Sequence, residues 1–551
     1  MQLARRLYLY FIAAVSLFAL ALGLTNLLDL LIETIRDAIQ GTDVVTGDAD
    51  AIRRQLSIYA AITIVALPIW LLHWWLAERG LDGGDGEEER RSAVRALYLS
   101  AVLSGSLIAG IVAVIRLVQL ATLWIVGADT RLWSGDTEQW IALLVVAGCI
   151  WAYHGWVRLR DLRGGPVDEE ADWLPRLYVY GAAFTGVTLL TFAVGDLLAL
   201  VVEIMTTDDN VIIGAGRWDG LLASGVSRAL VGTAVWSAHW LYSMRLADAP
   251  DWRGEHARAS ALRRFYGYSV AFGAVLLTLL LVTRVGEALL TELFNATPRD
   301  AEPFARRLLD PAVRALPFVV AWIYYRRQVL EESARFAEGN RQATVRRVYV
   351  YAIALIGLGL TGYGLASLIA VAVDRVTVTG DLVSAFGRDP WRAEVASLAS
   401  LTLVGASAWL WHWAHAQDWL KADPATERTA TVRRVYLFAV IAGSIVAVLV
   451  SLAIVMYRVF AELLGVEGSV ALVQELGEPL AVLLVAAGLL AYHAILLRAD
   501  LGERGASISE PGTTLQLVIS APAGANTDAI VATIKSHLPT GYAVRSVSRL
   551  D

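Results

Sequence analysis

A short motif that combines histidine with tryptophan occurs three times in the sequence. It reads Trp-x-x-His-Trp and ends at Trp74, Trp240 and Trp413, each time near the end of a long apolar run. Histidine is an axial haem ligand in membrane helix bundles, so repeated copies at one depth would allow facing pairs. Tryptophan is also typical of the membrane–water interface, where a histidine can form hydrogen bonds without a cofactor.

Every apolar hairpin of the chain has a residue at the histidine position, and we call these the belt residues. They are His73, His154, His239, Tyr325, His412 and His493. A tyrosine begins the first apolar run of each hairpin at a similar depth, so a hydrogen bond from this tyrosine to the belt residue is expected. Tyr325 replaces histidine in the fourth hairpin, which favours this structural bond over metal ligation. No cofactor or metal is therefore expected, and haem is the alternative.

A second group of candidates consists of charges inside the apolar runs. Arg228 and Arg314 each lie 11 residues before a belt residue, about 16 Å along a helix and close to the middle of a bilayer. Exposure to lipid there costs at least ~2.5–3.5 kcal/mol. We therefore expect both side chains to face the bundle interior, toward Asp196 or Asp310. They would either line an anion-attracting cavity or form a structural ion pair.

Other charges lie closer to the opposite boundary. Asp196 follows Tyr178 by 18 residues, which is about 27 Å along a helix. Arg284 is at the equivalent depth and can snorkel to water, with Glu287 on the same helix face as its partner. Arg458 has Glu462 at a similar spacing.

The amino-acid composition indicates that these candidate residues lie on transmembrane helices. Hydrophobic residues make up 57% of the 551 residues and charged residues only 18%, and mean hydropathy is +0.55. The runs are long enough to cross a hydrocarbon core roughly 30 Å thick. The chain is thus predicted to be an all-α membrane protein of about twelve transmembrane helices. A net charge of −6 supports no nucleic-acid partner, and the single Cys149 can form no internal disulfide.

Alternate hairpins repeat more regularly than neighbouring ones. Tyr8, Tyr178 and Tyr349 are 170 and 171 residues apart, and His-Trp occurs only in the first, third and fifth hairpins. The pattern predicts three tandem four-helix modules, residues 1–170, 171–340 and 341–500. Parallel modules of this kind would be related by a pseudo-threefold axis along the membrane normal.

Arginine is concentrated where hairpins begin and end, which predicts a cytoplasmic location for both termini. Residues 501–512 are expected to be a linker, and residues 513–551 a small cytoplasmic β-α-β segment. A segment of about 40 residues can form only a marginal hydrophobic core by itself. We expect this segment to contact the cytoplasmic face, a second copy of the chain or another protein.

The Arg-Arg-x-Tyr-x-Tyr helix starts, the paired apolar hairpins and the aromatic belts resemble a bacterial family of multi-pass membrane domains of unknown function. The resemblance implies a bacterial cytoplasmic (inner) membrane protein and brings no activity or site. The sequence contains no phosphate-binding loop and no nucleophile elbow, so no catalytic residues and no enzyme activity are expected. Gly357-Leu-Gly359-Leu-Thr-Gly362 matches the dinucleotide fingerprint in letters, but it lies inside an apolar run where close helix packing is expected.

Three functions remain open on these observations. The first is a transporter- or channel-like bundle with a polar centre in the middle module. The second is a non-catalytic membrane scaffold or sensor that recruits a partner through its C-terminal segment. The third is a haem- or quinone-binding redox subunit.

Overall fold

The computed structural model describes eleven stretches of the chain. They are residues 2–40, 49–82, 86–90, 92–128, 137–161, 169–207, 217–297, 301–335, 339–377, 390–465 and 472–508. The chain divides into two units, Met1–Leu497 and Arg498–Asp551. Of the second unit, the structure describes only the end of one helix, as far as Ile508. This helix occupies part of the segment predicted as a linker. The predicted β-α-β segment lies outside the described residues.

Regular elements within the described residues are all helical, and most of them pair into six hairpins. The hairpins are α1 (Gln2–Gln40) with α2 (Ala49–Arg79), α4 (Ala93–Ile125) with α5 (Thr137–Asp161), α6 (Glu169–Thr206) with α7 (Arg217–Ala247), α9 (Ala261–Leu293) with α10 (Phe304–Arg335), α11 (Asn340–Thr377) with α12 (Pro390–Ala422), and α14 (Thr431–Leu463) with α15 (Leu472–Ile508). Twelve helices in the described part of the chain are long and apolar enough to cross a membrane. The chain therefore has the make-up of a multi-pass membrane protein with three internal repeats.

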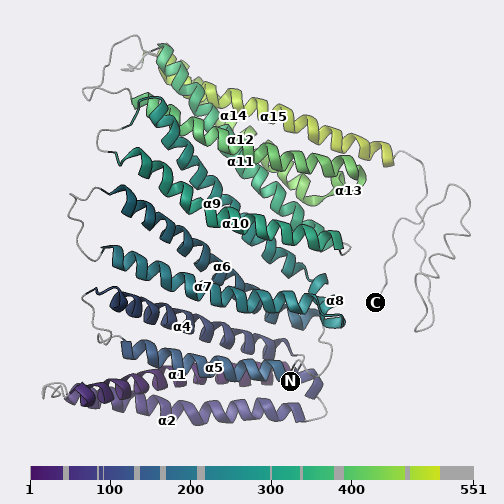
Figure 1. The fold of residues 1–551 in the computed structure, drawn as a ribbon. Helices are drawn as coiled ribbons and strands as arrows, with labels where there is room; N and C mark the ends of the chain where they lie inside the picture. The colour runs from purple at the N-terminus through teal and green to yellow at the C-terminus, as the bar shows by residue number, and fades with distance from the viewer. Residues whose placement is uncertain are drawn as a thin grey trace, which may run out of the picture. The chain divides into compact units, whose positions relative to one another are not determined.

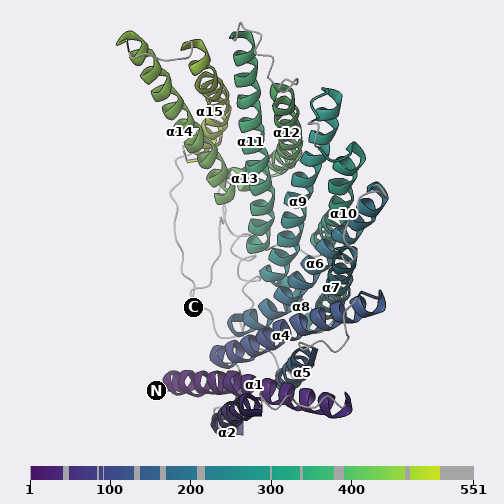
Figure 2. The same ribbon diagram turned by 90° about the vertical axis from the view of Figure 1, so that its left-hand side faces the viewer.

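Within residues 1–497 the hairpins follow one another in chain order (Figure 1). In the first five hairpins the first helix packs against its own partner, and in the first four it also packs against the second helix of the next hairpin: α1 against α5, α4 against α7, α6 against α10, and α9 against α12. At the last junction α11 packs against α14. The view from a direction 90° away shows the same order, with α1–α2 and α14–α15 at opposite ends of the row (Figure 2). The expected arrangement of modules around a threefold axis is wrong, because a linear stack places each hairpin beside its sequence neighbours.

Small residues allow the two helices of an odd-numbered hairpin to cross closely. A Cβ atom on Gly186 would lie 2.4 Å from the backbone nitrogen of Trp236, and one on Gly357 would lie 2.7 Å from that of Trp409. Both glycines follow the tyrosine of their helix by eight residues, and Ser16 takes this place in the first module. The glycine-rich run at Gly357 thus serves helix packing, as its position inside an apolar run predicts.

Short helices connect the two hairpins of each module: α3 (Gly86–Arg90), which follows a 3-10 turn at Gly80–Asp82, α8 (Trp252–Ala259) and α13 (Pro424–Thr429). Asp251 caps α8 by accepting hydrogen bonds from backbone N–H groups of its first turn. Asp423 caps α13 in the same way, and the hydrogen bonds from Thr426 lower the pKa of its carboxyl below the ordinary value. These caps stabilise the turns that lead into the second hairpin.

The close crossing in the third hairpin yields the first prediction. Gly186→Ala should lower the free energy of unfolding by about 1–3 kcal/mol, because the new methyl group forces α6 and α7 apart. Gly181→Ala is the matched control on the same helix, since a Cβ atom there meets nothing within 4 Å, and alanine there should be neutral or stabilising by up to about 1 kcal/mol. Denaturant titration of the purified protein, followed by circular dichroism, measures both. Equal effects of the two substitutions would contradict the close crossing.

Candidate functional site

Most belt residues form a hydrogen bond with the tyrosine near the start of the first helix of the same hairpin. His73 pairs with Tyr8 at 3.4 Å, His154 with Tyr98 at 3.3 Å, His239 with Tyr178 at 3.1 Å, and His493 with Tyr436 at 3.4 Å. In the fourth hairpin the Tyr325 hydroxyl bonds to that of Tyr266. His412 is the exception, because its buried Nε2 has no hydrogen-bond partner among the described residues. The expected tyrosine bond is therefore present in five of the six hairpins.

The hydrogen bond at Nδ1 determines the tautomer of the five belt histidines. In each of them Nδ1 lies 2.8–2.9 Å from the carbonyl oxygen four residues earlier; the residues are His73, His154, His239, His412 and His493. A carbonyl oxygen only accepts, so Nδ1 carries the proton and Nε2 is the acceptor of the neutral ring. In four of the five, the Nε2 atom that could bind a haem iron is already engaged by a tyrosine hydroxyl.

Tryptophans of the repeated motif join the two hairpins within a module. The second tryptophan of each motif donates its indole N–H to a tyrosine hydroxyl in the following hairpin: Trp74 to Tyr153 at 2.6 Å, Trp240 to Tyr324 at 2.7 Å, and Trp413 to Tyr492 at 2.9 Å. The same indole rings pack against the tyrosine of the next first helix, as Trp74 does on Tyr98 with ring centroids 5.3 Å apart. The motif thus belongs to a connection between hairpins, which explains its restriction to odd-numbered ones.

A buried arginine lies beside each of these tryptophans, and we call this arrangement the arginine clasp. Arg95 is 1% exposed and donates to Asp161 at 2.8 Å, to Glu78 at 2.7 Å and to the Tyr10 hydroxyl at 3.1 Å. Its guanidinium carbon is 5.5 Å from the centroid of the Trp74 ring. One residue therefore links helices α1, α2, α4 and α5 of the first module.

The second and third modules repeat the arginine clasp. Arg263 lies over Trp240 at 5.1 Å and donates to Glu332 at 2.6 Å and to Ser243 at 2.6 Å. Arg433 is fully buried over Trp413 at 5.8 Å and donates to the Tyr351 hydroxyl at 3.4 Å. The sequence indicates only that these arginines lie at helix starts. The missed signal was their constant place three residues before Tyr98, Tyr266 and Tyr436.

Four charged residues of the apolar helices come together in the middle module as one ion-pair network. Arg228 of α7 donates to Asp196 of α6 at 3.0 Å, and Arg314 of α10 also bonds to Asp196. Arg314 reaches Asp310, one turn away on its own helix, at 3.0 Å. The expected pairing of both arginines with Asp196 or Asp310 is present. The four side chains are 29–38% exposed, and together their formal charges cancel.

Asp196 lies nearer the membrane middle than the sequence indicates. The expectation placed Tyr178 and His239 at the same depth, but Gly186 packs against Trp236. At this helix crossing His239 lies opposite residue 183, so Tyr178 begins about one and a half turns before its belt residue. Asp196 is then about 20 Å from the belt, close to the depth of Arg228.

The remaining charges pair near the ends of their helices. Arg284 bonds to Glu287, three residues along the same helix, at 3.1 Å, and its side chain is 66% exposed. Arg458 bonds to Glu475 of the neighbouring α15 at 3.1 Å. Arg458 therefore pairs across the hairpin and not with the expected Glu462 of its own helix, because the second helix of a hairpin also presents acids to the first.

Comparison with known protein families finds one match, repeated along the chain. A family described as a domain of unknown function, DUF5671, matches residues 6–148, 176–324 and 347–488. Together these matches cover more than half of the sequence. The chain belongs to the DUF5671 family. Each match begins two residues before the first tyrosine of an odd-numbered hairpin, so the DUF5671 unit spans two hairpins and occurs three times.

Neither the comparison with curated proteins nor that with solved structures found a match. Membership of the DUF5671 family therefore describes the repeat and assigns no activity to it.

The arginine clasp leads to the second prediction. Arg95→Met should lower the free energy of unfolding by about 3–5 kcal/mol, because the buried carboxylate of Asp161 then keeps only its bond from Arg160, and Glu78 also loses a guanidinium donor. Arg53→Met is the control, since that side chain is 78% exposed and its ion pair contributes less than about 1 kcal/mol. Both values come from denaturant titration in detergent. If Arg95→Met lowers the free energy of unfolding no more than Arg53→Met does, the clasp does not hold the module together.

Proposed function

We propose that this DUF5671 protein is a non-catalytic scaffold of the bacterial cytoplasmic membrane, with both termini in the cytoplasm. The observation that carries the proposal is the linear stack of hairpins. A pathway through one chain needs helices that close around it, whereas here the hairpins follow each other in a row. Helices α2 and α10 also continue through Pro68 and Pro317 without interruption, while transporters often break helices at their binding sites.

Rigid connections between hairpins support the same proposal. Each module contains an arginine clasp and indole–tyrosine hydrogen bonds, all near one end of the helices. A scaffold holds its binding surfaces at fixed separations, and such buried connections resist relative motion of the hairpins. Residues 513–551 would supply the cytoplasmic segment that recruits a partner, whether another protein or a second copy of the chain.

The third prediction tests rigidity and transport together. In a Cys149→Ser background, spin labels at Ile39→Cys and Met205→Cys should give one narrow distance distribution in electron paramagnetic resonance. These positions are each 80% exposed and lie in α1 and α6. Liposomes containing the protein should show proton and chloride flux no greater than empty liposomes. Two distance populations combined with protein-dependent flux would overturn the scaffold proposal.

Transport remains the second candidate because of the ion-pair network in the middle module. Its side chains are one-quarter to two-fifths exposed at a depth where lipid contact is costly. Such residues mark ion pathways in many membrane proteins. Flux that disappears in Arg228→Leu, while the variant unfolds like the parent protein, would favour this candidate over a structural ion pair.

A redox role is the third candidate, and the belt histidines argue against it. Four of them use Nε2 to accept a tyrosine hydrogen bond, which competes with an iron atom for the same lone pair. The fourth prediction is therefore that protein purified from cells supplied with haem shows no Soret band. A Soret band that is lost in His412→Ala, the variant of the one belt histidine whose Nε2 has no hydrogen-bond partner among the described residues, would contradict this prediction.

A further inference from the structure

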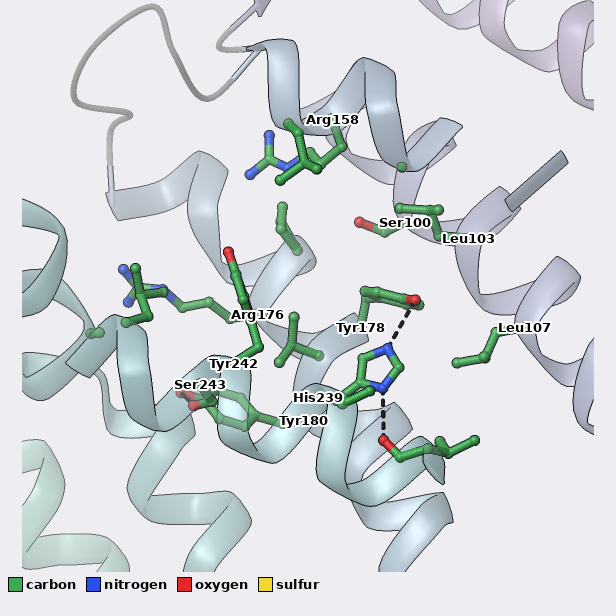
Figure 3. Close-up of a pocket in the computed structure, with 18 of the residues that line it drawn as sticks. Ser100, Leu103, Leu107, Arg158, Arg176, Tyr178, Tyr180, His239, Tyr242 and Ser243 are labelled. Atoms are coloured by element: carbon green, nitrogen blue, oxygen red, sulfur yellow. Dashed lines mark hydrogen bonds between the residues drawn. The ribbon is translucent and has the colours of Figure 1, made fainter. Parts of the chain in front are cut away.

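A cavity of about 620 Å³ lies where the first module meets the second (Figure 3). Its walls come from α4, α5, α6, α7 and α8. Most of its lining surface is apolar, and Leu103, Leu107 and Val235 belong to it. The volume is within the range of sites that hold small ligands.

The two junctions between modules are built on the same connection. At the first junction, Trp151 of α5 donates its indole N–H to the Tyr178 hydroxyl of α6 at 2.8 Å. At the second, Trp322 of α10 donates to the Tyr349 hydroxyl of α11 at 3.1 Å. Both tryptophans lie three residues before the belt residue of their helix. Residues at equivalent positions of the two junctions can therefore be compared directly.

Large planar side chains fill the second junction. Tyr268 packs on Tyr349 with ring centroids 5.1 Å apart. Trp411 packs edge to face on Trp322 with ring centroids 5.7 Å apart. The guanidinium carbon of Arg326 lies 5.0 Å from the centroid of the Trp411 ring. This junction thus holds an indole ring in contact with a second indole and a guanidinium.

Small residues occupy the same three positions at the first junction. The positions are two residues after the tyrosine of the first helix, one residue after the belt residue of the even-numbered hairpin, and one residue before that of the next hairpin. The first junction has Ser100, Gly155 and Ala238 where the second has Tyr268, Arg326 and Trp411. All three small residues line the cavity. The cavity therefore lies where the second junction has a phenol ring, a guanidinium and an indole ring.

A buried hydroxyl in the cavity wall is available to a ligand. Ser100 is 8% exposed, and its hydroxyl has no hydrogen-bond partner among the residues that the structure describes. Ser106 on the same helix instead donates to the carbonyl oxygen of Val102 at 2.7 Å. Figure 3 shows the Ser100 hydroxyl turned toward the cavity, while the Tyr178 hydroxyl and both ring nitrogens of His239 are already engaged. A buried hydroxyl without a partner is costly, so an acceptor atom on a ligand would stabilise it.

We propose that this cavity binds an isoprenoid quinone, which combines a planar ring, carbonyl oxygens at the ring edge and an apolar tail. The ring packs against Trp151 in the place that Trp411 takes at the second junction, and aromatic rings attract one another in such edge-to-face contacts. A carbonyl oxygen of the ring accepts a hydrogen bond from Ser100. The tail extends along Leu103 toward Leu107, which lies seven residues beyond Ser100 and about 10 Å deeper along α4.

The buried hydroxyl favours a quinone over a lipid acyl chain. An acyl chain would fill the apolar part of the cavity but would leave the Ser100 hydroxyl without an acceptor. It would also lack the flat shape of the groups that fill the second junction. The proposal concerns binding alone and involves no electron transfer, so it goes beyond the scaffold function and does not depend on it.

Isothermal titration calorimetry of the full-length protein in detergent tests the proposal, with decylubiquinone and decane as probes. Decylubiquinone should bind at least about tenfold more tightly than decane, because only the quinone has the ring and the carbonyl oxygens. Ser100→Ala should lower the affinity for decylubiquinone about threefold to tenfold, since it removes one hydrogen bond. Thermal unfolding of the ligand-free Ser100→Ala variant should be unchanged, because the hydroxyl has no partner among the described residues.

A second substitution tests the position of the ring. Ala238→Trp introduces the indole of the second junction, so it should lower the affinity for decylubiquinone at least about tenfold by occupying the same space. Leu230→Trp is the matched control, because Leu230 lies on the same helix, is 58% exposed and does not line the cavity. This control variant should bind decylubiquinone as the parent protein does.

Several outcomes would overturn the proposal. Equal affinity for decylubiquinone and decane would assign the cavity to an acyl chain. Unchanged affinity in Ala238→Trp, or an equal loss in Leu230→Trp, would place the quinone elsewhere. Unchanged affinity in Ser100→Ala would remove the hydrogen bond that selects a quinone. If Ala238→Trp fails to fold, the comparison of the two probes and the Ser100→Ala variant still decide.

Discussion

The buried guanidinium group in each module is the interaction on which the arrangement of the helices depends. An arginine that is almost fully buried among apolar helices is tolerated only where carboxylates, hydroxyls and an aromatic face replace its hydration. Arg95 has all three kinds of partner, and they come from different helices. Because losing any partner leaves a charge uncompensated, the clasp fixes the positions of four helices together. The belt histidines contribute to the same layer through bonds between the two helices of a hairpin.

Much of the architecture could be predicted from the sequence. The length and hydropathy of the apolar runs predict the helices, and the regular spacing of the motifs predicts the repeat. The tyrosine partners of the belt residues were also predictable, and Asp196 was a candidate partner of Arg228 because a charge inside a helix bundle needs an opposite charge beside it. The linear stack did not, since hydropathy carries no information about which helix faces are neighbours. Burial of Arg95 was missed for a related reason: an arginine at a helix start normally reaches water, and only the three-dimensional packing places it under Trp74.

The ion-pair network of the middle module is consistent with a rigid stack. Asp196 lies between two guanidinium groups on neighbouring helices of different hairpins, so it connects α6 to both α7 and α10. Asp310 completes the charge balance from the same helix as Arg314. A balanced network of four groups avoids the large cost of an isolated charge in hydrocarbon. It therefore needs no transported ion to account for its presence at this depth.

The middle module differs from the other two modules at two places, the ion-pair network and residue 257. Among the described residues only the middle module has an ion-pair network like that around Asp196, and its sequence has Ala257 where the other modules have Glu89 and Glu427. In the other two modules these glutamates pair with Arg6 and Arg347, each at 2.7 Å. The exchange of the acid for Ala257 places a methyl group at the same position, so the contacts at this junction differ from those of the two related modules.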